Sequence, residues 1–132
     1  MNPENILAEF ERAIRALQAA KNLCEDGLNE DAVSRSYYAV MHAAKAALLV
    51  HDAIAESYAA VRRLFGSVLV RQGILEKEWA AVLAREQDER IIADYGIGAL
   101  WQPEDLSRLI EEAEAFVQRI RAYLVNVGLS VK

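Results

Sequence analysis

Apolar residues recur along the chain at intervals of three and four, which is the spacing of one face of an α-helix. Five such stretches follow one another, separated by short connections that contain Gly, Pro, Ser or Asp. No segment alternates apolar and polar residues over its length, so the pattern excludes a sheet. The stretches predict helices from Pro3 to Gly27, from Asn29 or Glu30 to about Asp52, from Ser57 to Gly73, from about Glu76 to Asp94 and from Pro103 to Val127.

Residues suited to helix ends lie at these boundaries. Asn2 and Ser57 can cap helices, and Pro3 and Pro103 fit the first helical position. The helices are followed or closed by Gly27, Gly73, Gly96, Gly98 and Gly128. Short connections favour antiparallel neighbours. The sequence therefore predicts an all-α fold, an up-and-down bundle of four to five helices that forms one domain over residues 1–132.

The second predicted helix is rich in alanine, so a neighbouring helix can approach it closely. In the fourth helix, residues 85–90 are polar, and Gly66 in the third stripe indicates close packing or a bend. The residues expected to be buried include Val33, Tyr37, Val40, Ala44, Ala47 and Leu48 of the second helix and Trp79, Val82 and Leu83 of the fourth.

A chain of 132 residues is long enough to bury a core without help from a metal or a disulfide. The single cysteine, Cys24, is expected to be a small buried residue rather than a nucleophile, and it fits a reducing compartment. No apolar run is long enough to span a membrane, and the first residues lack the basic start of a signal peptide. We therefore expect a cytoplasmic protein.

The net charge of −5 argues against a protein that coats nucleic acid through a broadly basic surface. The charge is nevertheless uneven, because residues 35–85 carry seven Lys or Arg against four Asp or Glu. Two interpretations stay open for this basic segment. It forms either ordinary solvated helix faces or a local anion-binding surface.

The sequence predicts neither a metal site nor a bound cofactor. It contains no Glu-x-x-His pair of the di-metal bundle type, and His42 and His51 lack a Cys or His partner at ligand spacing. Glycine-rich phosphate loops and dinucleotide fingerprints are also missing from the sequence.

Arg35 and His42 carry the most distinctive chemistry in the chain. They are seven residues apart, so they share one helix face at a separation of about 10 Å along the axis. A histidine can exchange a proton with a hydroxyl near neutral pH, and an arginine can stabilise charge on a phosphate. Together they suffice for RNA cleavage by the neighbouring 2′-hydroxyl, and a second copy related by a twofold axis would bring two such pairs together. The alternative is structural, with Arg35 paired to Asp31 or Asp94 and His42 a satisfied core residue.

Two blocks of this sequence resemble the HEPN domain family, and in particular its small stand-alone members. These blocks are Ser34-Arg35-Ser36-Tyr37-Tyr38-Ala39 with His42-Ala43-Ala44, and Arg90-x-x-x-Asp94-Tyr95. The resemblance spans almost the whole chain and implies an all-α bundle that is commonly a homodimer. Many members are metal-independent ribonucleases with an Arg-x4–6-His motif, which falls here on Arg35 and His42. Ser36 occupies the position where the family often has Asn, Asp or His.

The resemblance implies two alternative functions. The chain is either a metal-independent endoribonuclease, including the toxin of a toxin–antitoxin pair, or a non-catalytic module that binds a nucleotide or a nucleotidyltransferase-type partner. In the first case His42 is the general acid–base and Arg35 stabilises the phosphate. A charge cluster of Arg90, Asp94 and Arg35 is expected either to support this site or to orient the fourth helix on the second. The predicted supporting or binding residues are Ser36, Tyr38, Lys45, Arg90, Asp94 and Tyr95.

Overall fold

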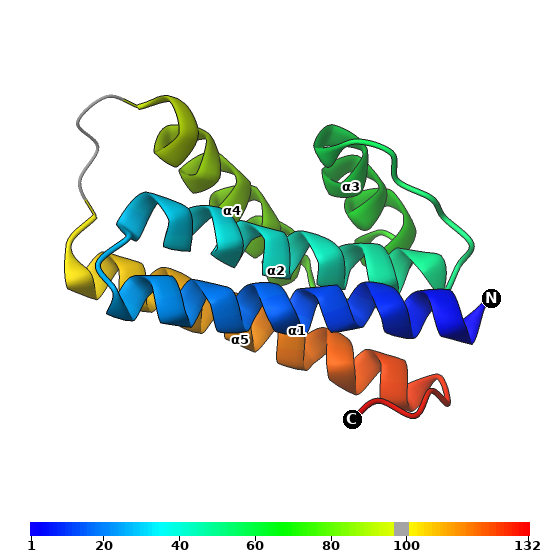
Figure 1. Ribbon diagram of the computed structural model, residues 1–132. Coiled ribbons are helices and arrows are strands. Elements are labelled where there is room, and N and C mark those ends of the chain that lie inside the picture. The colour runs from blue at the N-terminus through cyan, green and yellow to red at the C-terminus, as the bar shows by residue number, and fades with distance from the viewer. Residues whose placement is uncertain (97–100) are drawn as a thin grey trace.

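The computed structural model describes residues 1–96 and 101–132, which form helices joined by short turns (Figure 1). No strand occurs within these two ranges, so the predicted all-α bundle is confirmed. The predicted break at Gly98 lies outside the described residues. The elements are α1 (Pro3–Glu25), α2 (Asn29–Leu49), α3 (Tyr58–Leu64), the π-helix η1 (Phe65–Val70), α4 (Lys77–Tyr95) and α5 (Pro103–Asn126).

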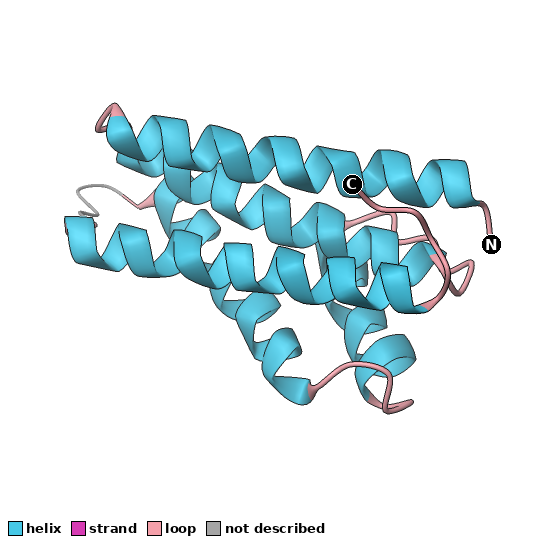
Figure 2. Cartoon of the chain, turned by 90° about the horizontal axis from the view of Figure 1, so that it is seen from below, coloured by secondary structure: helices cyan, strands magenta, loops and turns pink. Residues whose placement is uncertain are grey.

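Helix α2 lies at the centre of the bundle. It contacts α1, α3, η1, α4 and α5, whereas no other helix contacts all the remaining elements within residues 1–96 and 101–132. Figure 1 shows α1, α2 and α5 lying lengthwise, while α3 and α4 diverge from the same side of α2. Short loops connect the helices, as Figure 2 shows. The two shorter helices therefore cover one side of α2, and α1 and α5 contact it elsewhere.

The composition of α2 explains why it can contact so many neighbours. Ala39, Ala43 and Ala46 are fully buried, and their small side chains let adjacent backbones approach closely. The predicted stripe is confirmed, because each of its members is also inaccessible to solvent: Val33, Tyr37, Val40, Ala44, Ala47 and Leu48. A helix buried on most of its circumference has few positions left for polar side chains.

Local signals fix most helix ends as predicted. The Asn2 side chain accepts a hydrogen bond from the Asn5 backbone N–H, and Ser57 Oγ accepts one from Ala60 N–H at 3.0 Å. Pro3 and Pro103 begin α1 and α5. Among the described residues, no helix is long and apolar enough to cross a bilayer.

The third predicted helix differs from expectation because it is not a single α-helix. It changes to the wider π-helix η1 at Phe65 and ends at Val70, before the turn in which Gly73 has a φ of 76°. A Cβ at Gly66 would meet nothing within 4 Å, so close packing does not require glycine there. The change of helix type falls at Phe65, directly before Gly66.

Helix α4 contains the largest departures from the predicted burial. Val82 and Leu83 are buried as predicted, but Trp79 is only half-buried, with its ring edge-on to Phe116. Glu86 lies in the polar segment and is nevertheless fully buried. Cys24 in α1 is also half-buried rather than a core residue. The burial of Glu86 arises because α4 packs on both α2 and α5, so two of its faces are covered.

Candidate functional site

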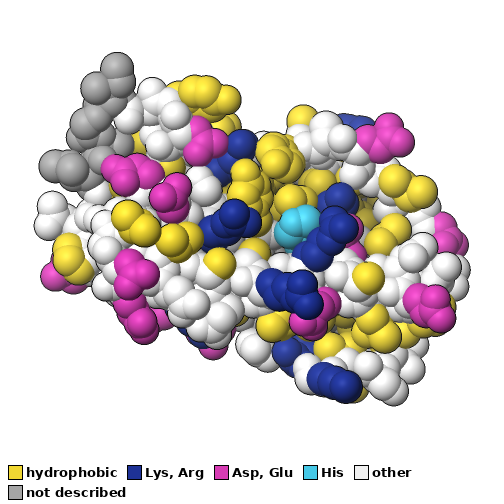
Figure 3. Space-filling view, in the orientation of Figure 1, with side chains coloured by type: hydrophobic (Ala, Val, Ile, Leu, Met, Phe, Trp, Pro, Cys, Tyr) yellow, Lys and Arg dark blue, Asp and Glu magenta, His cyan; other side chains and the backbone are white. Residues whose placement is uncertain are grey.

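A groove of about 420 Å³ lies along α2, beside α3 and the loop that precedes it. Figure 3 shows a histidine in a hollow of this face, with Lys or Arg side chains on both sides of it. Four predicted site residues line the groove because their spacing of three and four places them on one face of α2. They are Arg35, Tyr38, His42 and Lys45. Met41, Ala55, Glu56, Ser57, Tyr58 and Val61 complete the lining.

Glu9 of α1 holds the imidazole of His42. The His42 Nδ1 and Glu9 Oε2 atoms are 2.5 Å apart, and the two side chains are only 19% and 12% exposed. Because an ionised carboxylate can only accept a hydrogen bond, Nδ1 carries the proton and Nε2 is the basic nitrogen of the neutral ring. Burial raises the pKa of Glu9, but the His42 hydrogen bond and the Lys45 charge outweigh it, so the pKa lies below its ordinary value.

Lys45 shares the same carboxylate, since its Nζ atom is 3.6 Å from Glu9 Oε1. Sequence reasoning missed Glu9. One signal could have found it, because Glu9 lies three residues after Ile6 and four before Ala13, within a stripe of fully buried residues. A carboxylate at such a position needs a polar partner from another helix.

Arg35 is exposed and forms no ion pair with a carboxylate of residues 1–96 or 101–132. Its guanidinium lies 5.7 Å from the centre of the Tyr38 ring. Neither alternative ion pair of Arg35, with Asp31 or with Asp94, forms within residues 1–96 and 101–132, and Asp94 contacts other partners. Arg90 lies 3.0 Å from one Asp94 oxygen, and Ser34 Oγ donates to the other at 3.1 Å.

Arg90 connects α4 to α2 and α3, but it does not line the groove. Its guanidinium lies 4.8 Å from the centre of the Tyr58 ring, and 5.8 Å and 5.9 Å from those of Tyr38 and Tyr37. Burial lowers the pKa of Arg90, but Asp94 and the tyrosines raise it by more than burial lowers it. The pKa of Arg90 therefore lies above its ordinary value. The predicted charge cluster thus forms without Arg35, and its geometry favours orientation of α4.

Two other predicted supporting residues lie away from the groove. Tyr95, at the end of α4, is 77% exposed and is not part of the lining. Ser36 is fully buried because one step along α2 rotates it by about 100° from Arg35, toward α4 and α5. Ser36 was expected to support the site, but it does not line the groove and its side chain is buried in the core instead.

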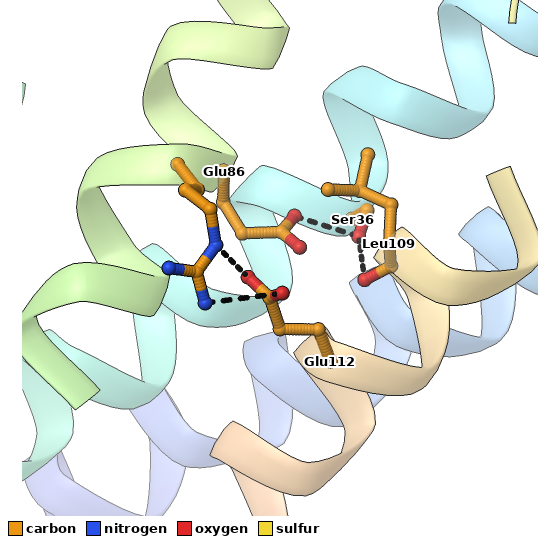
Figure 4. A network of polar contacts seen from close by, with 5 residues as sticks. Ser36, Glu86, Leu109 and Glu112 are labelled. Atoms are coloured by element: carbon orange, nitrogen blue, oxygen red, sulfur yellow. Dashed lines mark hydrogen bonds and ion pairs between the residues drawn. The ribbon is translucent and has the colours of Figure 1, made fainter. Parts of the chain in front are cut away.

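Ser36 belongs to a buried polar contact between α2, α4 and α5, which Figure 4 shows. Its Oγ donates to Glu86 Oε1 at 2.8 Å and lies 3.5 Å from the Leu109 carbonyl oxygen. Burial raises the pKa of Glu86 to about 8, although the Ser36 bond opposes the shift. Glu86 is therefore mostly protonated at neutral pH. Beside it, Arg85 pairs with Glu112 at 3.3 Å.

A second hollow, of about 540 Å³, lies between α4 and α5. Its lining has three acidic residues against two arginines, and one of these arginines, Arg85, is already paired with Glu112, so it offers less positive charge to a ligand than the groove does. The described residues also contain no group of three or more His, Cys, Asp or Glu that could hold a metal ion. The groove along α2 is thus the better-defined candidate site.

Comparisons with known proteins agree with this architecture. The HEPN domain model matches residues 8–123. A Methanocaldococcus jannaschii protein with the name "Putative toxin MJ0605" is 37% identical over 124 residues, or 94% of this chain and 92% of the relative. A Gloeobacter violaceus protein named "UPF0332 protein glr0978" is 34% identical over 118 residues, which are 89% of this chain and 94% of the relative.

A Pyrococcus horikoshii protein named "UPF0332 protein PH1297" is 32% identical over 88 residues, which are 67% of this chain and 62% of the relative. The family match begins within α1 and ends within α5, so it includes every helix that shapes the groove. The resemblance that the motifs indicated is confirmed, and the chain belongs to the HEPN domain family.

Proposed function

We propose that this chain is a metal-independent endoribonuclease in which His42 is the general acid–base and Arg35 stabilises the phosphate. One observation carries the proposal: an arginine without a carboxylate partner among the described residues shares a groove with a histidine whose Nδ1 is held by a carboxylate. The guanidinium can pair with a phosphate because no internal anion occupies it. The imidazole can exchange a proton at its other nitrogen.

The reaction uses these groups, from one copy of the chain or from two, and the RNA. Neutral His42 accepts the 2′-hydroxyl proton at Nε2 while the 2′-oxygen forms a bond to phosphorus. The bond from phosphorus to the 5′-oxygen breaks, and that oxygen receives a proton from a His42 imidazolium, either the ring that took the 2′-hydroxyl proton or the His42 ring of a second copy. The products are a 2′,3′-cyclic phosphate and a 5′-hydroxyl. Arg35 stabilises the charge that builds on the phosphoryl oxygens, and Glu9 keeps the imidazole in one tautomer and orientation.

A homodimer would complete this site. Arg35 and His42 are separated by about 10 Å along α2, which is wide for one phosphate. A second copy related by a twofold axis would place another Arg35 and His42 across the cleft. One histidine would then accept the 2′-hydroxyl proton while the other protonates the leaving oxygen. Sedimentation at micromolar concentration should show a dimer, and a strict monomer would remove the shared cleft.

We further propose that the chain acts as the toxin of a toxin–antitoxin pair, with a nucleotidyltransferase-type antitoxin as its partner. The support is the name of the Methanocaldococcus jannaschii relative, which describes a toxin. Expression alone should arrest growth, and co-expression with the neighbouring gene product should relieve the arrest. If the protein binds that neighbour but degrades no RNA, it is a non-catalytic module.

The decisive experiment is cleavage of labelled RNA in the presence of a chelator. The wild-type protein should cleave, and His42→Ala should be about 10²–10⁴-fold slower because it lacks the proton carrier. His51→Ala is the matched control, since His51 contacts Tyr123 and lies outside the groove. Equal cleavage by wild type and His42→Ala, or none by either, would contradict the proposal.

A further inference from the structure

The groove has an aromatic wall that the proposed chemistry does not use. Tyr38 of α2 and Tyr58 at the start of α3 both line it, with ring centres 6.4 Å apart. Tyr37 lies behind them, fully buried, with its ring 5.4 Å from Tyr58 in an edge-to-face arrangement. Core packing accounts for Tyr37. It does not account for Tyr58, which remains 36% exposed at the groove.

The exposed ring is held in place before any ligand arrives. The Arg90 guanidinium lies over the Tyr58 ring at 4.8 Å, and Asp94 fixes that guanidinium through an ion pair of 3.0 Å. Because Arg90 does not line the groove, it supports the ring from outside. A ring already restrained loses little conformational freedom on binding, which favours a stacking contact.

The charges beside this wall indicate how a nucleotide would lie. Arg35 is 5.7 Å from the Tyr38 ring and has no carboxylate partner among the described residues, so it is suited to bind a phosphate. Glu56 lines the groove two residues before Tyr58 and repels an anion. The lining lysine, Lys45, is paired with Glu9, so the phosphate is expected at Arg35 and the base at the adjacent tyrosines. A volume of about 420 Å³ is in the range of small-molecule sites.

We propose that Tyr58 and Tyr38 form a stacking subsite for an unpaired nucleobase that flanks the phosphate held by Arg35. The inference rests on the proposed function for its ligand, RNA. A base stacked on an aromatic wall has left its own helix, so the subsite selects unpaired nucleotides over duplex. Stacking depends on the ring rather than on the phenol hydroxyl, and this gives the test its conservative variant.

The test is equilibrium binding of an unstructured 2′-O-methyl RNA oligonucleotide, which lacks the attacking hydroxyl and stays intact. Tyr58→Leu should weaken binding by about 10-fold or more, whereas Tyr58→Phe should bind as wild type does. Arg35→Gln should also weaken binding, but it should reduce the dependence of affinity on salt, which Tyr58→Leu should leave unchanged. The same strand annealed to its complement should bind more weakly.

Equal affinity of Tyr58→Leu and wild type, or equal affinity for duplex and single strand, would overturn the subsite. Thermal melting of each variant separates lost stacking from lost folding, and Tyr58→Trp provides a second test because it keeps a ring at that position. Failure here is distinct from failure of the proposed function. If binding depends on Tyr58 but no RNA is cleaved, the proposed ribonuclease activity is contradicted and the stacking subsite is supported. If RNA is cleaved but Tyr58→Leu binds as wild type does, the ribonuclease activity is supported and the stacking subsite is contradicted.

Discussion

Arg35 and Ser36 are neighbours on α2, yet they lie in opposite environments. Arg35 is exposed at a groove with no carboxylate partner among the described residues, while Ser36 is sealed in the core against Glu86. On the groove side, the Arg35 guanidinium is exposed to solvent, so a ligand can interact with its charge. On the core side, burial raises the pKa of the carboxyl until the group is mostly neutral. One residue step on a central helix thus separates groups available for binding from groups committed to folding.

The largest expected effect tests this comparison directly. Arg35→Gln should slow RNA cleavage by about 10²–10³-fold, because it removes charge from the phosphate site, and should leave the free energy of unfolding nearly unchanged. Ser36→Ala should do the opposite, with normal cleavage and a loss of about 1–3 kcal/mol in stability, since Glu86 then lacks its partner. Cleavage rates and urea denaturation measure the two effects.

Arg15→Gln is the control for the arginine change, because that side chain is 80% exposed and does not line the groove. The comparison fails if Ser36→Ala abolishes cleavage while the protein remains folded. In that case Ser36 would act on the site through α2, and the two environments would not be independent.

A second prediction concerns pH. The folded-state pKa of Glu86 is about 8, above its ordinary value of 4.5, so between these values the folded state binds a proton that the unfolded state has released. Glu86 should therefore lower stability by about 1.4 kcal/mol per pH unit as the pH rises through this window. Glu86→Gln, which cannot ionise, should lack this slope. Urea denaturation from pH 5 to 9 measures it, and parallel profiles for the two proteins would contradict the prediction.

The smallest expected effect tests the role of Glu9 at the groove. Glu9→Gln should lower kcat of RNA cleavage by about 10-fold with little change in KM, because Glu9 positions His42 rather than touching RNA. Glu11→Gln, two residues away in an exposed pair with Arg15, is the matched control and should cleave as wild type does. A change in KM alone would show that Glu9 affects RNA binding instead.

Most of the fold could be predicted from local patterns. The caps at Asn2 and Ser57 and the stripe of α2 depend on residues close in sequence, so periodicity and propensity were sufficient. The shared face of Arg35, Tyr38, His42 and Lys45 was predictable for the same reason. Their proposed roles remain predictions.

The remaining site features depend on contacts between distant parts of the chain. Glu9 and His42 are 33 positions apart, and Ser36 and Glu86 are 50 apart, so no local spacing indicates either pair. The expected Arg35–Asp94 contact was wrong because Arg90, one turn before Asp94 on the same helix, occupies that carboxylate. The burial of Glu86 could not be inferred from a segment that is polar throughout.

The contacts of α2 with every other element also bear on how the molecule opens. A segment that touches all its neighbours exchanges its amide protons only when the whole domain unfolds, whereas a short helix at the rim opens more readily. Arg35 and His42 are carried by the first kind of segment, and Tyr58 begins a short helix in which the Arg90 guanidinium of α4 restrains its ring. Transient opening of α3 would then change the width of the groove while its chemical groups stay in register.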